Sequence, residues 1–336
     1  MTTKHRPLRR AFLKGAAATT TALAAGFPLL ATGATLHKLR IATLAPDGSS
    51  WHKALKQMAR QVKRRTKGAV ELAIYAGGTM GDEPAMIRKM RTGQLDGAAV
   101  TNVGLGEINK QLLMLKLPLL FRGYDDVDRV RDAMSDKFEA LLQAEGFRIS
   151  GWGDVGFSYL FSSAPIKRPE DLKKTKMWSW SADPVGTELM KVAGVNAVSL
   201  EAPDVMASLQ TGLVDGFSSS PYGAIAMQWY TKARYVTDLR LGMTIGGSVL
   251  REESWAKLSD QHKLVVDDVF KGVHRKLIRK VRSANAKALG VLINKGITKV
   301  KPEAFAAWKS LAEQVRENLT GSVFDASLVN EMLGHL

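Results

Sequence analysis

The sequence predicts an α/β protein with two similar lobes, and three observations lead to this prediction. First, one short segment occurs twice, as "RTGQLDG" at 91–97 and as "QTGLVDG" at 210–216. Second, each copy lies at the end of the same series of predicted elements, which runs strand, helix, strand, helix and strand. Third, two long extended runs are followed by one long helical pattern. A solenoid would repeat many times at a period of roughly 20–50 residues, so two distant copies fit two lobes better.

The elements around the first copy form a β-α-β-α-β unit, which implies a parallel sheet. The helix after the first strand is amphipathic, with apolar residues spaced three and four apart from Trp51 to Val62, and Ser49 or Ser50 can cap it. The next helix contains Met86 and ends at Gly93. The predicted order is strand 39–45, helix 51–67, strand 70–77, helix 84–92 and strand 95–102.

The second copy repeats this order. The predicted elements are strand 173–180, helix 183–194, strand 196–200, helix 202–212 and strand 213–219. In both copies a glycine, Gly93 or Gly212, ends a helix, and we expect both to adopt the left-handed conformation. Asp96 and Asp215 then read as turn residues and not as catalytic acids.

The strands of the two repeats end at Thr101-Asn102 and at Ser219-Ser220. Ligands of open parallel sheets bind just outside the carboxyl ends of the strands. The sequence therefore predicts a binding site that these two strand ends share.

Two glycine-punctuated extended runs, 147–163 and 235–250, are too long for one lobe, and we expect them to cross between the lobes. A helix from about 259 to 294 follows; at about 1.5 Å per residue it is long enough to brace both lobes. Crossing strands between two lobes describe a hinge around a cleft. The predicted boundaries are 1–34 for a signal peptide, 37–155 plus about 243–283 for lobe I, and 156–242 plus about 284–336 for lobe II.

The N-terminus has the pattern of an export signal. Arg9-Arg10 stand in "RRAFLK", ahead of an uncharged stretch from 15 to 34 that is rich in alanine and threonine. A membrane anchor is the alternative, but this stretch is weakly apolar and ends in small residues, which is typical of a cleavable leader. The pattern resembles a twin-arginine (Tat) signal, with cleavage near Gly33 or Ala34, and predicts a periplasmic protein.

The composition excludes several classes of function. The chain has no cysteine, which excludes disulfides and thiolate metal sites. The formal charge of +16 falls to +11 without the five basic residues before position 35. The remaining basic residues fall mainly on solvated helix faces, so we do not expect nucleic-acid binding. Neither a zinc-helix histidine pair, nor a phosphate loop, nor a nucleophile elbow is present, so we predict no cofactor, no metal and no catalysis.

Aromatic residues point to the character of the site. Trp178 and Trp180 stand two apart in one predicted strand and therefore share a face. Phe157 and Tyr159 lie in the first crossing run, and Trp51 begins the first helix. Each alone is more typical of a core, but two tryptophans at the end of a cleft-facing strand favour a ligand wall.

The chain resembles the solute-binding proteins of tripartite ATP-independent periplasmic (TRAP) transporters, of the dicarboxylate-binding type. The resemblance covers about 37–255 and rests on segments such as "GGTMGDEPAMIRKMRTGQLDGA", "RPEDLKKTKM" and "LQTGLVDGF". It implies a two-lobed periplasmic-binding-protein fold that closes on a small ligand. It also implies integral-membrane TRAP subunits as partners, with an accessory periplasmic protein as a further candidate.

Three departures from the family pattern bear on the ligand. The family arginine that grips a ligand carboxylate is replaced by Trp178, a second arginine aligns with Ser158, and a common asparagine aligns with Ser220. Burying an organic acid without its counter-charge is costly. We therefore expect a neutral, apolar or aromatic ligand, with a carboxylate binder that takes its cation from Arg122, Lys110 or Arg234 as the alternative. A periplasmic α/β enzyme is the distant alternative. The predicted ligand-binding residues are Trp178, Trp180, Phe157, Tyr159, Ser158, Trp51, Met80, Asn102, Ser219, Ser220 and Tyr222.

Overall fold

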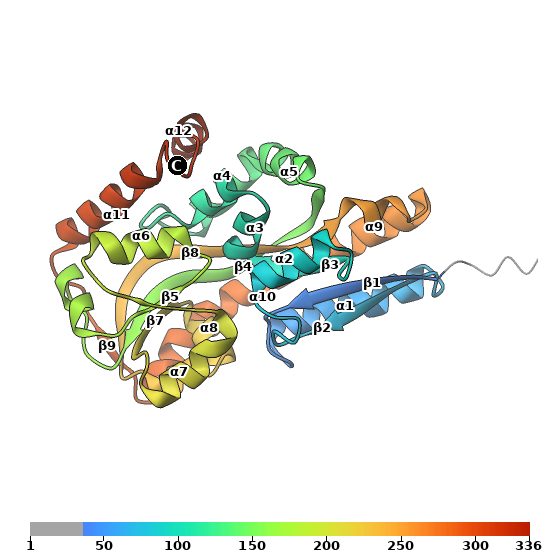
Figure 1. The fold of residues 1–336 in the computed structure, drawn as a ribbon. Helices are drawn as coiled ribbons and strands as arrows, with labels where there is room; N and C mark the ends of the chain where they lie inside the picture. The colour runs from blue at the N-terminus through green and yellow to red at the C-terminus, as the bar shows by residue number, and fades with distance from the viewer. Residues whose placement is uncertain (1–35) are drawn as a thin grey trace, which may run out of the picture. The chain divides into compact units, whose positions relative to one another are not determined.

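The computed structural model describes residues 36–336 (Figure 1). The predicted signal peptide, with Arg9-Arg10 and the cleavage site, lies outside the described residues. The strands are β1 (His37–Thr43), β2 (Val70–Tyr75), β3 (Gly97–Thr101), β4 (Phe147–Ser162), β5 (Trp178–Trp180), β6 (Val198–Leu200), β7 (Gly216–Ser219), β8 (Tyr235–Arg251) and β9 (Thr298–Val300).

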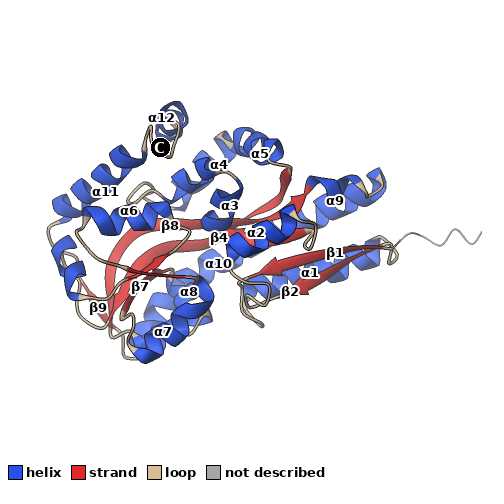
Figure 2. Cartoon of the chain, viewed as in Figure 1, coloured by secondary structure: helices blue, strands red, loops and turns tan. Residues whose placement is uncertain are grey.

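Helices cover these strands (Figure 2). The α-helices are α1 (Ser50–Arg65), α2 (Glu83–Arg91), α3 (Asn102–Ile108), α4 (Tyr124–Ala133), α5 (Ser135–Ala144), α6 (Pro184–Val192), α7 (Val205–Thr211), α8 (Pro221–Ala226), α9 (Glu252–Ala256), α10 (Asp260–Asn294), α11 (Phe305–Leu319) and α12 (Ala326–Gly334). The 3₁₀ helices are η1 (Lys110–Lys116), η2 (Pro169–Lys174), η3 (Ala202–Asp204) and η4 (Trp229–Lys232). Among the residues that the structure describes, no helix is long and apolar enough to cross a membrane.

The first strand group consists of β2, β1 and β3, which pair in parallel as predicted. The helix between β1 and β2 begins after Ser49, whose side chain accepts the backbone N–H of His52 at 3.2 Å. Its apolar stripe is buried at Ala54, Leu55, Met58 and Val62.

The second strand group consists of β6, β5 and β7. β5 and β6 pair in parallel, and a single parallel bridge between Met177 and Gly216 connects β5 to β7. The predicted strand from 173 was wrong in its first half, because residues 169–174 form η2. Pro169 stands at the first position of that turn, and the Asp171 carboxylate accepts the N–H groups of Lys167 and Arg168.

The two long strands β4 and β8 run antiparallel along almost their whole length between the two groups. β8 pairs with β3 and β4 pairs with β7, both antiparallel, so the two groups extend the same central pair in opposite directions. The strand β4 changes register against β8 at three places, between Ile149 and Gly151, between Asp154 and Gly156, and between Ser158 and Leu160. At the middle one, Gly156 has φ 122°. The 35-residue helix α10 packs on β4, on α1 and on α8, as expected for a brace.

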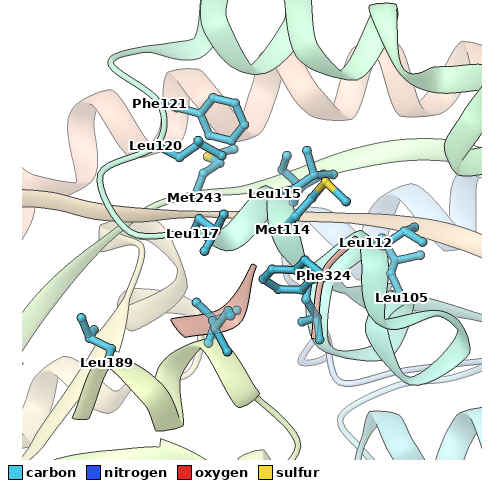
Figure 3. Packing of buried hydrophobic residues seen from close by; sticks show 14 of the residues in the cluster. Leu105, Leu112, Met114, Leu115, Leu117, Leu120, Phe121, Leu189, Met243 and Phe324 are labelled. Carbon is cyan, nitrogen blue, oxygen red and sulfur yellow. The ribbon is translucent and has the colours of Figure 1, made fainter. Parts of the chain in front are cut away.

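The largest hydrophobic cluster joins elements that are distant in sequence. Figure 3 shows Leu112, Met114 and Leu115 of η1 in the same cluster as Phe324, which follows α11. Leu189 of α6 belongs to the same cluster. The C-terminal helices therefore contribute to the core that supports η1 and α6, and both of these elements reach the site described below.

Candidate functional site

A cavity of about 260 Å³ lies where the two strand groups meet β4 and β8. The carboxyl ends of β1, β3, β5 and β7 all reach it, so the site lies at the predicted edge. The middle of β4 and the segment 241–247 of β8 complete the wall together with α1 and α6. A small organic molecule is the size of ligand that such a volume holds.

Seven of the predicted ligand-binding residues line this cavity. They are Trp51, Asn102, Ser158, Trp178, Trp180, Ser219 and Ser220. They come from both strand groups, from α1 and from β4, so the fold brings together residues that are far apart in the sequence.

Four predicted residues do not line the cavity. Successive strand residues point to opposite faces, so Ser158 of β4 faces the cavity while Phe157 and Tyr159 do not. Phe157 instead packs against the ring of Tyr124, with 5.1 Å between centroids. Tyr222 lies behind Trp51, with its hydroxyl 2.8 Å from Ser50 Oγ. Met80 lies in the glycine-rich turn before α2, and its carbonyl accepts a hydrogen bond from Lys89 Nζ.

Four tryptophans line the cavity, and three of them, Trp51, Trp178 and Trp180, have partners for their indole N–H groups; the fourth is Trp229 of η4. Trp178 donates to the Leu200 carbonyl at 3.1 Å, Trp180 to Asp82 Oδ2 at 2.7 Å, and Trp51 to the Asp154 carbonyl at 3.0 Å. The rings of Trp178 and Trp180 lie 5.9 Å apart, as expected for neighbours on one face of a strand. These side chains therefore offer a ligand carbon surface and no free donor.

Lys116 at the end of η1 is the only lysine or arginine that lines the cavity within residues 36–336. Its ammonium group forms an ion pair with Asp183, which precedes α6. The cations named in the alternative hypothesis, Arg122, Lys110 and Arg234, do not line the cavity. Lys116 was not predicted, although a single cation within the apolar run "LLMLKLPLLF" is a signal that could have identified it.

Two further carboxylates of the wall are held by the protein. Glu83 accepts hydrogen bonds from Thr101 N–H, Thr101 Oγ1 and Gly104 N–H, and burial raises its pKa to about 7. Asp154 accepts hydrogen bonds from Arg131 at 3.3 Å and from Arg282 at 2.6 Å. The wall therefore carries more acidic than basic side chains.

His274 of α10 lines the cavity in its neutral form. Its Nε2 lies 2.9 Å from Ser248 Oγ, and burial lowers its pKa to about 4. The imidazole therefore supplies no positive charge at neutral pH. Among the described residues, no group of three or more His, Asp or Glu side chains is arranged to hold a metal ion.

The repeated segments lie outside the cavity wall, as the turn interpretation requires. Asp96 and Asp215 do not line the cavity. Gly93 and Gly212 both have φ 73°, which confirms the predicted left-handed conformation. The repeat therefore shapes the strands whose ends form the site and does not contact a ligand there.

The chain is similar to known solute-binding proteins. The chain is 26% identical over 216 residues to a solute-binding protein of Chromohalobacter salexigens, which covers 64% of each chain. It is 28% identical over 183 residues to the 2,3-diketo-L-gulonate-binding periplasmic protein of Escherichia coli K12, covering 53% of this chain and 54% of that protein. The match thus spans less than two thirds of the length of either relative.

A TRAP periplasmic solute binding protein from Ralstonia eutropha H16, solved with bound (S)-2-acetolactate, shares the fold. Its TM-score is 0.84 at 21% identity, covering 89% of this chain and 98% of that one. The two-lobed α/β prediction is therefore confirmed. The family model for bacterial extracellular solute-binding proteins of family 7 matches residues 41–321, which confirms a binding protein in place of an enzyme. By this match over most of its length, the chain belongs to the bacterial extracellular solute-binding proteins of family 7.

Proposed function

We propose that this protein is the solute-binding component of a TRAP-type secondary transporter and that it captures a neutral, apolar or aromatic compound. The observation that carries the ligand class is the composition of the cavity wall. Four tryptophans line it, and its only lysine or arginine within residues 36–336 is neutralised by Asp183. The captured compound then passes to integral-membrane subunits, with an accessory periplasmic protein as a further candidate partner.

Two physical terms favour such a ligand. Apolar area removed from water contributes about 25 cal/mol per Å², so contact with the indole rings favours a flat or apolar molecule. A carboxylate would meet electron-rich indole faces, and it would find no unpaired cation in the wall. The same wall that stabilises a neutral ring therefore disfavours an organic acid.

The test is a thermal-shift panel on the unmodified mature protein. Aromatic and lipid-like neutral compounds are compared with short dicarboxylates and sugar acids, and we expect stabilisation by neutral compounds only. Micromolar binding of dicarboxylates without any response to a neutral compound would overturn the ligand class and leave the family assignment intact. Trp178→Arg is the matched variant, because it places a guanidinium where the family arginine aligns; we expect it to weaken the neutral ligands.

A second candidate function is the conventional binding of an organic acid. Its specific support is Lys116 in the cavity wall, together with the acids named for the relatives from Escherichia coli and Ralstonia eutropha. In this case the ligand carboxylate would displace Asp183 from the ammonium group. Lys116→Met would then abolish acid binding, whereas under the leading proposal the same variant leaves acids unbound, as they are in the unmodified protein.

We further propose export to the periplasm through the twin-arginine pathway. The support is the sequence "RRAFLK" and the family, which is described as extracellular. Changing Arg9 and Arg10 together to lysine should leave full-length precursor in the cytoplasm. Mature-sized protein in the periplasm of that variant would show that the pathway is a different one.

We propose that the two lobes meet near 155 and 242, as predicted from the sequence. The support is the middle of the three register changes of β4, between Asp154 and Gly156, because it coincides with the positive φ of Gly156. The φ of Gly156 is 122°, and a Cβ atom there would lie 2.4 Å from Asn285 Nδ2. Gly156→Ala should therefore change the ligand-induced decrease in the radius of gyration measured by small-angle scattering. An unchanged decrease would place the hinge elsewhere.

A further inference from the structure

Two polar atoms of the cavity wall lack a hydrogen-bond partner within the described residues. They are Asn102 Nδ2 and Asp183 Oδ1. Their residues are 0% and 3% exposed, respectively. Buried polar atoms are almost always paired, so an unpaired one in a ligand cavity marks where a ligand atom completes the hydrogen bond.

The hydrogen bonds that Asn102 and Asp183 already make show whether their unpaired atoms are donors or acceptors. Asn102 Oδ1 accepts the N–H of Ile245 at 2.8 Å, so the free Nδ2 of Asn102 is a donor. Asp183 Oδ2 binds Lys116 Nζ, so the free Oδ1 is an acceptor. The ammonium group of Lys116 carries three N–H bonds, and Asp183 Oδ2 occupies one of them.

The Asp183 carboxylate faces Lys116 and not the backbone of its own helix, α6. Asp183 is the N-cap residue of α6, where such a side chain normally accepts a backbone N–H of the helix, but it makes no capping bond. A Cβ atom at Gly186 would lie 2.6 Å from Asp183 Oδ2, so the glycine leaves room for the carboxylate to face Lys116. The pair joins α6 to η1, which are 67 positions apart at these residues.

We propose that the ligand is an uncharged compound that carries a hydroxyl group on an aromatic or alicyclic body. The hydroxyl donates to Asp183 Oδ1 and accepts from Lys116 Nζ, and a second oxygen of the ligand accepts from Asn102 Nδ2. A carboxylate ligand has no proton to donate, so it would leave Asp183 Oδ1 unpaired. It would also place its negative charge beside that of Asp183. A hydrocarbon would leave all of these buried atoms unpaired.

This inference rests on the proposed function and narrows its ligand class. The probes are three compounds that share a methoxybenzene ring: 4-methoxybenzyl alcohol, 4-methoxytoluene and 4-methoxybenzoate. They differ only in the group that would reach Asp183. Binding to the unmodified mature protein is measured by calorimetry. We expect the alcohol to bind at least about tenfold more tightly than either other probe, as for a hydrogen bond to a charged group.

Two variants test the assigned atoms. Asp183→Asn releases the Lys116 cation, so the preference for the alcohol should be lost and affinity for 4-methoxybenzoate should rise about tenfold. Asn102→Asp keeps the acceptor for the Ile245 N–H but removes the free donor, so the alcohol should bind about tenfold more weakly. Asp136→Asn, an exposed aspartate of α5 outside the cavity, is the matched control and should change nothing.

The outcomes separate this inference from the proposed function. If 4-methoxytoluene binds as tightly as the alcohol, the hydroxyl contact is contradicted while the neutral ligand class stands. If no probe binds, the inference is also contradicted, and the wider thermal-shift panel decides the ligand class alone. If 4-methoxybenzoate binds best to the unmodified protein, the neutral ligand class itself is wrong.

Discussion

The two copies of the repeated segment hold their neighbouring strands in the same way, but only the first copy buries its contact. In the first copy, the Arg40 N–H donates to Asp96 Oδ2 at 2.8 Å, and the Asp96 N–H donates to the Arg40 carbonyl at 2.9 Å. The guanidinium group of Arg40 also donates to the Gly93 carbonyl at 2.7 Å. Asp96 therefore ties the start of β3 to β1, and Arg40 ties β1 to the segment that follows α2.

The second copy repeats these contacts with lysine in place of arginine. The Lys176 N–H donates to Asp215 Oδ1 at 2.7 Å, and the Asp215 N–H donates to the Lys176 carbonyl at 3.0 Å. The ammonium group of Lys176 donates to the Gly212 carbonyl at 3.1 Å. The repeat is thus a clamp between backbone segments, which explains why it recurs without lining the cavity.

The copies differ in burial and in charge pairing. Asp96 is 8% exposed and also accepts hydrogen bonds from Arg40 Nε at 2.7 Å and Ser254 Oγ at 2.8 Å. Asp215 is half-buried beside the exposed Lys176. The shared backbone contacts set the geometry in both copies, whereas a full ion pair is present only where the carboxylate is removed from water. The first clamp should therefore contribute more to stability.

The largest expected effect is the loss of the buried clamp. Asp96→Ala should lower the free energy of unfolding by about 3 kcal/mol, because Arg40 and Ser254 lose a shared charged partner. Asp215→Ala, the matched change in the second copy, should cost about 1 kcal/mol. Urea unfolding of the mature protein measures both values. Equal losses would contradict the difference drawn from burial.

Acid should remove part of the Asp96 contribution. Burial alone would raise the pKa of Asp96, but the hydrogen bonds from Arg40 and Ser254 outweigh it and lower the pKa. The unfolded state then binds the proton more tightly, so the stabilisation is complete above about pH 3.9 and is lost as pH falls through the lowered value. The stability gap between the unmodified protein and Asp96→Ala should narrow below about pH 4 in urea titrations. A gap that stays constant into strong acid would contradict the lowered pKa.

The clamp also shows which parts of the fold the sequence could predict. Glycine after a helix and Asp-Gly before a strand are local signals, and they correctly located β3 and β7. The pairing of those strands with β8 and β4 has no local pattern, because it joins residues that are distant in the sequence, such as Gly97 with Leu250 and Gly216 with Ser162. The short strand β9, which pairs with β8 at Tyr235, was not predicted for the same reason.

The site was predictable where it follows from strand geometry. The predicted ends of β3 and β7 identified Asn102, Ser219 and Ser220 as residues that line the cavity. The alternation within β5 identified its two tryptophans in the same way. In β4 the predicted set included residues of both faces, Phe157 and Tyr159 on one and Ser158 on the other, and only Ser158 lines the cavity. Lys116 and Asp183 were missed because their importance lies in the ion pair, which only the folded chain brings together.

Replacing the helix-ending glycines Gly93 and Gly212 with valine should give a smaller difference in unfolding free energy between the two copies. Both positions have φ 73°, so a side chain is strained at either one. A Cβ atom at Gly93 would also lie 2.9 Å from Arg251 Nη1, whereas one at Gly212 would meet nothing within 4 Å. We expect losses of about 1 to 2 kcal/mol at both positions in urea unfolding, with the larger loss for Gly93→Val, where the Arg251 guanidinium group has to move. Gly290→Ala in α10 is the control, and it should stabilise slightly. A larger loss at Gly212 than at Gly93 would contradict the role given to the Arg251 contact.

Exchanging the two basic residues of the clamps has the smallest expected effect and tests the comparison most directly. Arg40→Lys leaves one ammonium group to serve both Asp96 and the Gly93 carbonyl, which the planar guanidinium reaches together, so it should cost about 1 kcal/mol. Lys176→Arg adds donors at an exposed site, where an ion pair contributes little, so the change should stay within about 0.5 kcal/mol. Thermal unfolding of both variants at low and high salt measures this, and only the Arg40 loss should persist at high salt, because a partly buried pair is weakly screened. If the two exchanges shift the unfolding midpoint equally, the clamps are equivalent and burial does not distinguish them.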